Sequence, residues 1–244
     1  MKNDIVLITG ASRGIGASTA RILGRRGYLV CVNYFKNSDL AEIVANTIIK
    51  DGGKAITMQS DVSNEKNVVN LFERINTNYG DVTALVNNAG CNGGFLLSEE
   101  ISFQKLLSVF SLNVFGIFIT IREAVKNMKK VGKGSIVNIS SEAAKYGGNK
   151  LIHYAASKAA VNAATIGFAR ELAPYNIRVN AVSPGVIDTD AHEGISKERR
   201  ETLKKSLPLG RMGKPGEVAK TIAWLLSDDA SYVSGSIIPV SGAR

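Results

Sequence analysis

Short apolar runs alternate along the whole chain with segments whose apolar residues recur at helical spacing. The runs predict strands at Ile5–Thr9, Leu29–Asn33, Lys54–Gln59, Ala84–Val86, Ser135–Ile139, Arg178–Val182 and Ser236–Val240. The spacing predicts helices at Gly14–Arg26, Leu40–Lys50, Val68–Asn78, Ser102–Leu112, Val114–Lys130, Tyr154–Ala173 and Glu217–Leu226. Such alternation indicates βαβ units. We therefore expect an α/β fold, a doubly wound parallel sheet of seven strands in a single domain spanning residues 1–244.

One segment departs from this pattern. Residues 188–208 are polar and charged, and we expect them to form a mobile lid over a site. The longest apolar stretch, about Val109–Ile121, is interrupted by polar residues and is too short to span a bilayer. A strand begins almost at the first residue, where a signal peptide would lie. We expect a cytoplasmic protein with no membrane partner.

Composition narrows the classes of partner. The net charge is +9, and small basic clusters lie at Lys126–Lys133 and Lys197–Lys205. Neither cluster contains interleaved aromatic residues for base stacking, so solvated helix faces are favoured over nucleic-acid binding. An anionic cofactor or substrate is the other explanation of the charge. Two cysteines and two histidines, with Cys31 in a buried strand, do not predict a metal site.

A glycine-rich turn follows the first predicted strand at Thr9–Gly16 (TGASRGIG). Its spacing is G-x-x-x-G-x-G, which differs from the dinucleotide fingerprint G-x-G-x-x-G. In the first βα turn of a doubly wound sheet, such glycines let backbone N–H groups and a helix N-terminus approach a pyrophosphate. We expect cofactor contacts from Gly10, Ser12, Arg13, Gly14, Ile15 and Gly16.

The end of the second strand bears on the choice of cofactor. An NAD-binding fold places a carboxylate there, whereas this chain has Asn33, Tyr34 and Lys36. Arg13 and Lys36 would favour the 2′-phosphate of NADP(H), although both residues fit ordinary surface charges as well. Asp39 lies near enough to keep NAD(H) open.

Two further turns follow strands at the same expected edge of the sheet. Asp61, with Val62, has two compatible interpretations: a hydrogen-bond acceptor for the adenine amino group, or the N-cap of the next helix. The second turn, Asn87–Gly90 (NNAG), faces the crevice where ligands bind in such folds. Its cofactor contacts are expected from Asn88, Ala89 and Gly90.

Four polar residues form the candidate catalytic group. Tyr154 and Lys158 lie four residues apart on one helix face, where an ammonium would lower the pKa of the phenol. Tyr154 would then act as general acid or base. Ser141, after the fifth strand, would stabilise charge on a substrate oxygen. Asn113 interrupts an apolar helical run, either as a satisfied buried amide or as a backbone link that holds a relay water near Lys158.

Together these motifs resemble the short-chain dehydrogenase/reductase family over the whole chain. TGASRGIG, NNAG, the tetrad of Asn113, Ser141, Tyr154 and Lys158, and Arg178–Gly185 each match a family motif. The resemblance implies a Rossmann fold and hydride transfer between a nicotinamide and a carbonyl or alcohol carbon. It also implies nicotinamide contacts from Pro184, Gly185, Ile187 and Thr189, cofactor contacts from Tyr154 and Lys158, and a homotetramer.

The substrate is less well defined by the sequence. Pro208–Gly213 and Ser231–Gly235 resemble both 3-oxoacyl-carrier-protein reductases and sugar dehydrogenases. Tyr175 replaces the basic residue common in carrier-protein reductases, and the ending Ser241–Arg244 lacks the usual paired glycines. The alternatives are an NADPH-dependent ketone or 3-oxoacyl reductase, a sugar or polyol dehydrogenase, and a non-catalytic NADP(H)-binding regulator.

For three residues near the expected substrate pocket, the sequence leaves two roles possible. Cys91 follows NNAG and is expected to line the pocket, more as a packing residue than as a reactive thiol. His153 and His192 either touch substrate or play an incidental polar part.

Overall fold

Seven parallel strands form one sheet in the computed structural model, which describes residues 4–189 and 197–243. The strand order is β3-β2-β1-β4-β5-β6-β7, so the chain reverses its direction of winding between β1 and β4. The strands are β1 (Ile5–Ile8), β2 (Leu29–Tyr34), β3 (Lys54–Gln59), β4 (Val82–Asn87), β5 (Gly134–Ile139), β6 (Ile177–Pro184) and β7 (Ile237–Val240). This arrangement confirms the predicted Rossmann-like α/β fold.

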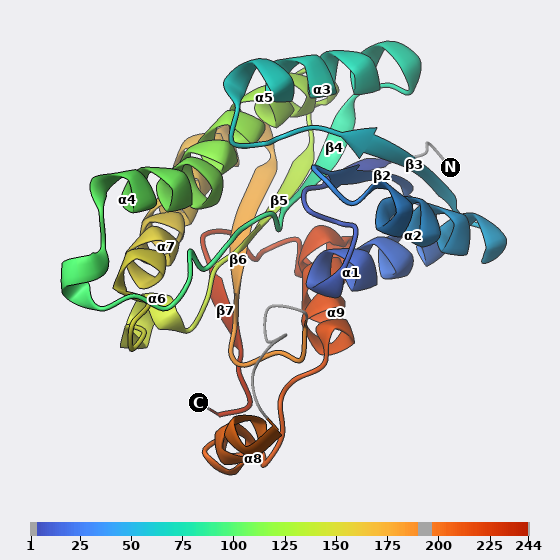
Figure 1. Ribbon diagram of the computed structural model, residues 1–244. Helices are drawn as coiled ribbons and strands as arrows, with labels where there is room; N and C mark the ends of the chain where they lie inside the picture. Colours follow the sequence, from blue (N-terminus) through green and yellow to red (C-terminus); the bar gives the residue numbers. More distant parts are fainter. Residues whose placement is uncertain (1–3, 190–196, 244) are drawn as a thin grey trace.

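Helices cover both faces of the sheet (Figure 1). One face carries α1 (Gly14–Arg25), α2 (Ser38–Lys50) and α9 (Pro215–Leu226). The other carries α3 (Glu65–Asn78), α4 (Phe103–Phe110), α5 (Gly116–Val131) and α7 (Ile152–Leu172). Fully buried strand residues such as Leu7, Ile8 and Val86 fill the space between, as expected for strands covered on both sides.

The two helical stretches predicted on either side of Asn113 are present as α4 and α5. The helical backbone is continuous from α4 to α5 through a π-helical turn at Ser111–Phe115. Phe103–Val131 is therefore long and apolar enough to cross a membrane by length and composition alone, contrary to the expectation from the interrupted apolar run. Side chains of α5, including Ile121 and Met128, are fully buried in the core beneath the sheet, as in the core helix of a globular protein.

The segment after β6 contains a helix that apolar periodicity did not predict. Helix α8 (Lys197–Lys205, KERRETLKK) has one apolar residue, Leu203, so it carries no stripe from which a helix could be recognised. It lies apart from the sheet (Figure 1), and Leu207 beyond it is buried. Residues 190–196, with His192, lie outside the described residues, and the lid interpretation of 188–208 stays a prediction.

Candidate functional site

The turn between β1 and α1 has the shape that a pyrophosphate requires. Gly10 and Gly14 have φ of +61° and +57°, which L side chains rarely adopt. A Cβ on Gly16 would lie 2.7 Å from the Gly10 carbonyl oxygen. The first turn of α1 contains no acidic residue, and Arg13 at its N-cap makes no side-chain capping bond. The positive end of α1 is therefore directed at this turn, and a dinucleotide phosphate fits the site.

Two asparagines hold this turn in place. The Asn88 amide donates to the carbonyl oxygens of Thr9 and Gly10, both at 2.9 Å. The Asn33 carbonyl oxygen accepts from the Gly10 N–H at 3.3 Å, and its amide donates into β3 at the Met58 carbonyl. Both side chains are thus used within the protein and shape the turn. Cofactor contact from either residue stays a prediction.

The end of β2 places the candidate 2′-phosphate ligands at the surface. Arg13 and Lys36 are exposed, and Tyr34 is half-buried against the core. Asp39 lies in the first turn of α2, where it accepts from the Ser38 hydroxyl at 3.2 Å. A carboxylate is therefore present near this edge, in the first turn of a helix rather than at the strand end.

A cavity of about 280 Å³ opens beside Asp61 at the ends of β2 and β3. Its other walls are Phe35, Gln59, Ser60, Asn67, Asn70, Leu71 and Arg74. The N-cap interpretation of Asp61 was wrong, because Asn64 caps α3 by accepting from the Asn67 N–H. Asp61 instead closes a short turn on the Ser63 N–H and hydroxyl, at 2.9 and 2.7 Å. Val62 behind it is buried.

The segment after β6 crosses the glycine turn. Pro184 ends β6, and the Gly185 N–H donates to the Val240 carbonyl at 3.1 Å. Ile187 is buried, and the Thr189 methyl lies 3.5 Å from the position of a Cβ on Gly14. The structure therefore places Thr189 beside the glycine turn, and Gly185 and Ile187 lie between it and Pro184 at the carboxyl end of β6. Their contacts with a nicotinamide stay a prediction.

The four candidate catalytic residues converge from three elements. Helix α7 carries Tyr154 and Lys158, and Ser141, which follows β5, lies close enough to Tyr154 to lower the pKa of its phenol. The Lys158 ammonium donates to the Ile139 carbonyl at 2.7 Å. A Cβ on Gly90 would lie 3.5 Å from Lys158 Nζ and closer still to Asn113, so this glycine permits the approach.

Burial dominates the electrostatics of this group. It raises the pKa of Tyr154, and nearby Ser141 opposes that rise. Burial also lowers the pKa of Lys158 to about 8. The expected lowering of the tyrosine pKa by the ammonium was therefore wrong for this structure. Lys158 Nζ lies 5.8 Å from the centre of the Tyr154 ring, and desolvation is the larger effect.

Asn113 fixes the loop that follows NNAG. It is fully buried in the π-helical turn. Its amide donates to the Cys91 carbonyl at 2.8 Å and to the Ser157 hydroxyl at 3.0 Å, and its oxygen accepts from the Cys91 N–H at 2.9 Å. The satisfied-amide interpretation describes this side chain. The water relay stays a prediction.

A buried chain of polar side chains was missed by the sequence analysis. Thr120 of α5 donates to Asn87, Asn87 donates to Asn138 of β5, and Asn138 donates to Thr165 of α7. These bonds are 2.7–3.0 Å long and join the helices to the sheet beneath the site. The available signal was a polar residue inside an otherwise apolar strand, as at Asn138.

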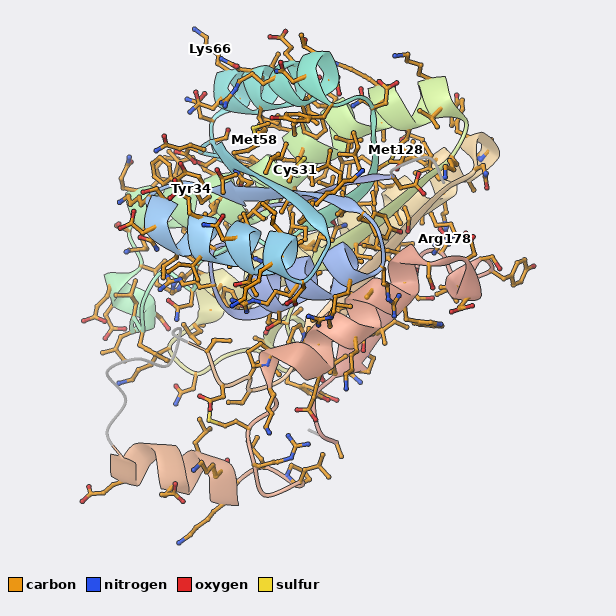
Figure 2. The ribbon with its side chains drawn as sticks, turned by 90° about the vertical axis from the view of Figure 1, so that its right-hand side faces the viewer. Cys31, Tyr34, Met58, Lys66, Met128 and Arg178 are labelled. Atoms are coloured by element: carbon orange, nitrogen blue, oxygen red, sulfur yellow. The ribbon has the colours of Figure 1, made fainter. Side chains whose placement is uncertain are left out.

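The two cysteines differ in environment. Cys31 lies inside the molecule (Figure 2). Burial raises the pKa of its thiol to about 12. Cys91 is exposed, so its interpretation as a packing residue was wrong. Its backbone is held by Asn113, and its side chain lies close enough to Tyr154 and Lys158 to raise the pKa of both.

The basic cluster at Lys126–Lys133 fits a solvated helix face. Lys126 pairs with Glu123, Lys130 with Asp81 and Lys133 with Asp4. Lys129 Nζ lies 3.7 Å from the centre of the Tyr175 ring. Among residues 4–189 and 197–243, no three His, Cys, Asp or Glu side chains are grouped to hold a metal.

Comparison with known proteins gives a consistent result. The family model described as enoyl-(acyl carrier protein) reductase matches residues 10–242. The uncharacterized oxidoreductase YgfF of Escherichia coli (strain K12) is 44% identical, covering 98% of this chain and 99% of that protein. The 3-oxoacyl-[acyl-carrier-protein] reductase FabG of Thermotoga maritima is 37% identical, covering 99% and 98%. Glucose 1-dehydrogenase 2 of Bacillus subtilis is 36% identical, covering 97% and 92%.

Proposed function

Since this chain belongs to the short-chain dehydrogenase/reductase family of oxidoreductases that act on CH–OH groups, we propose that it is an NADP(H)-dependent carbonyl reductase. Its substrate would be a 3-oxoacyl compound or a small ketone. The observation that carries the proposal is the convergence of Ser141, Tyr154 and Lys158 at the carboxyl end of β5, where Lys158 Nζ lies 5.8 Å from the centre of the Tyr154 ring and donates to the Ile139 carbonyl. Membership of this family of oxidoreductases also argues against the alternative that the protein is a non-catalytic NADP(H)-binding regulator.

The bound cofactor would supply a hydride from its nicotinamide, and the chain would supply the proton. The raised pKa of Tyr154 keeps the phenol protonated at neutral pH, as a general acid in reduction requires. Ser141 would hold the substrate oxygen beside that hydroxyl. Lys158, with a pKa of about 8, is largely protonated at pH 7 and would favour the phenolate that forms after proton transfer.

The preference for NADP(H) rests on the end of β2. No carboxylate stands at the strand end, and two exposed cations, Arg13 and Lys36, lie near it. We expect Arg13→Ala to weaken NADPH binding at least tenfold while changing NADH binding little, because one charge-assisted contact to the 2′-phosphate would be lost. Fluorescence titration with both cofactors measures this, and equal losses would contradict the NADP(H) assignment.

A sugar or polyol dehydrogenase is the second candidate, supported by the similarity to glucose 1-dehydrogenase 2 over nearly the whole chain. We propose a cytoplasmic homotetramer in either case. The assembly is supported by large apolar side chains exposed on the α4–α5 helices, where Phe103 is 76% exposed and Phe115 and Phe118 about half.

The test follows NADPH and NADH absorbance with purified protein. The panel contains a 3-oxoacyl thioester and small ketoesters for reduction, and glucose and polyols for oxidation. We expect NADPH-dependent reduction by the wild type, and loss of turnover with cofactor binding kept in Tyr154→Phe. Tyr146→Phe removes the hydroxyl of an exposed tyrosine nearby and serves as the matched control. Substantial turnover by Tyr154→Phe would remove this residue from the reaction.

A further inference from the structure

His153 is a buried imidazole whose nitrogens are unsatisfied. Its side chain is 1% exposed, and neither Nδ1 nor Nε2 has a hydrogen-bond partner among the residues that the structure describes. By contrast, the buried side chains of Asn113 and Lys158 are both hydrogen-bonded. Leaving a buried polar group without a partner destabilises a fold, so this position calls for an explanation.

The Gly93 backbone lies directly against this imidazole. A Cβ on Gly93 would lie 2.8 Å from His153 Nε2 and 2.6 Å from a methyl of Val109. Gly93 therefore has to lack a side chain for the ring to lie where it does. On the next residue, Gly94, a Cβ would meet no atom within 4 Å. The edge of the ring that carries Nε2 thus faces a thin backbone cover, with open space beside it.

The cover is anchored at both ends, and between them the Gly94 N–H donates to the Asn92 side-chain oxygen at 2.9 Å. Asn113 holds Cys91 at one end, and the Leu96 N–H donates to the Lys150 carbonyl at the other, at 2.8 Å. Gly93 and Gly94, with φ of +74° and +89°, lie between these anchors. A displacement of this short stretch would uncover Nε2 on the side now covered by Gly93, while both anchors stay in place.

We infer that His153 is a specificity-determining residue, which hydrogen-bonds a second oxygen of the substrate when the Asn92–Phe95 stretch moves aside. The inference rests on the proposed function and narrows its substrate class to carbonyl compounds with another oxygen function near the reacting carbonyl. A neutral imidazole presents one N–H donor and one acceptor. A site of this kind discriminates against an analogue that lacks the oxygen, because its own polar atom is then left unpaired.

The test compares two ketones of equal chain length. Ethyl 3-oxobutanoate has a second carbonyl two carbons from the ketone, and heptan-2-one does not. The readout is the ratio of their kcat/KM values, in which the intrinsic reactivities cancel between enzyme variants. We expect His153→Leu to lower the ratio about tenfold, the effect of one hydrogen bond, and His153→Gln to keep it near the wild-type value.

Val109→Ala is the matched control, because it loosens the same contact with Gly93 without changing a hydrogen-bonding group. It should leave the ratio within about twofold of wild type. If His153→Leu leaves the ratio of kcat/KM values unchanged, the inference is overturned and His153 is assigned to packing. This holds whether the variant slows the reduction of both ketones equally or only lowers the Tm. Inactivity of the wild type on both ketones would instead reject the proposed reductase function, and the inference with it.

Discussion

Replacing Lys158 by methionine tests whether a buried ammonium makes the stability of this fold depend on pH. Lys158 is 4% exposed, and burial lowers its pKa from 10.5 to about 8. Its ammonium donates to the Ile139 carbonyl at 2.7 Å. Methionine is unbranched and fills a similar volume without a charge, so Lys158→Met removes the titration while largely keeping the packing.

The sign of the effect follows from proton binding. Between pH 8 and 10.5 the unfolded chain holds the lysine proton more often than the folded chain does, so the stability of the wild type rises with pH across this window. The gap of about 2.5 pKa units corresponds to roughly 3 kcal/mol at 1.36 kcal/mol per unit. About 2 kcal/mol of this falls between pH 7.5 and 9.5.

The assay is urea unfolding of both proteins, without cofactor, at pH 7.5 and 9.5. We expect the free energy of unfolding of wild type, relative to Lys158→Met, to rise by about 2 kcal/mol between these values. Cys31 has a raised pKa of about 12, which lowers the stability of both proteins above pH 9. Because this effect is common to both, it cancels in the difference between them. A difference that stays constant with pH would refute the depressed lysine pKa, whatever the absolute stability of the variant.

Three further predictions concern the turn, the loop and the thiols. Gly16→Ala would place a Cβ 2.7 Å from a carbonyl oxygen of the same turn and should lower stability by about 1–3 kcal/mol and weaken NADPH binding, measured by thermal unfolding and titration. Gly167→Ala, in open space on α7, is its control and should be neutral or stabilising. Asn113→Leu loses three buried hydrogen bonds and should cost roughly 3 kcal/mol in urea unfolding; under 1 kcal/mol would contradict its anchoring role. A thiol reagent should modify Cys91 in the native protein and Cys31 only after unfolding, and rapid reaction of both would contradict the burial of Cys31.

Apolar periodicity predicted the strands and most helices because the sheet is buried on both faces, and its strands therefore read as unbroken apolar runs. Helix α8 was missed because the same signal is absent from it. Its sequence has one apolar residue and therefore no apolar stripe along one side. The π-helical turn around Asn113 was also missed. Its polar residue looked like a break, whereas the fold satisfies that amide with the backbone of Cys91 from a loop 22 residues away.

The sequence by itself determined the βαβ order, the glycine turn and the identity of the candidate catalytic residues, because these depend on local spacing and residue type. Only the tertiary structure decided the direction of the pKa shifts of Tyr154 and Lys158, since desolvation depends on everything that packs around a group. It also decided that Asn33 and Asn88 brace the glycine turn and that His153 lies unpaired beneath Gly93. Such pairings join residues far apart in the chain, and no local pattern encodes which partner a polar side chain will meet.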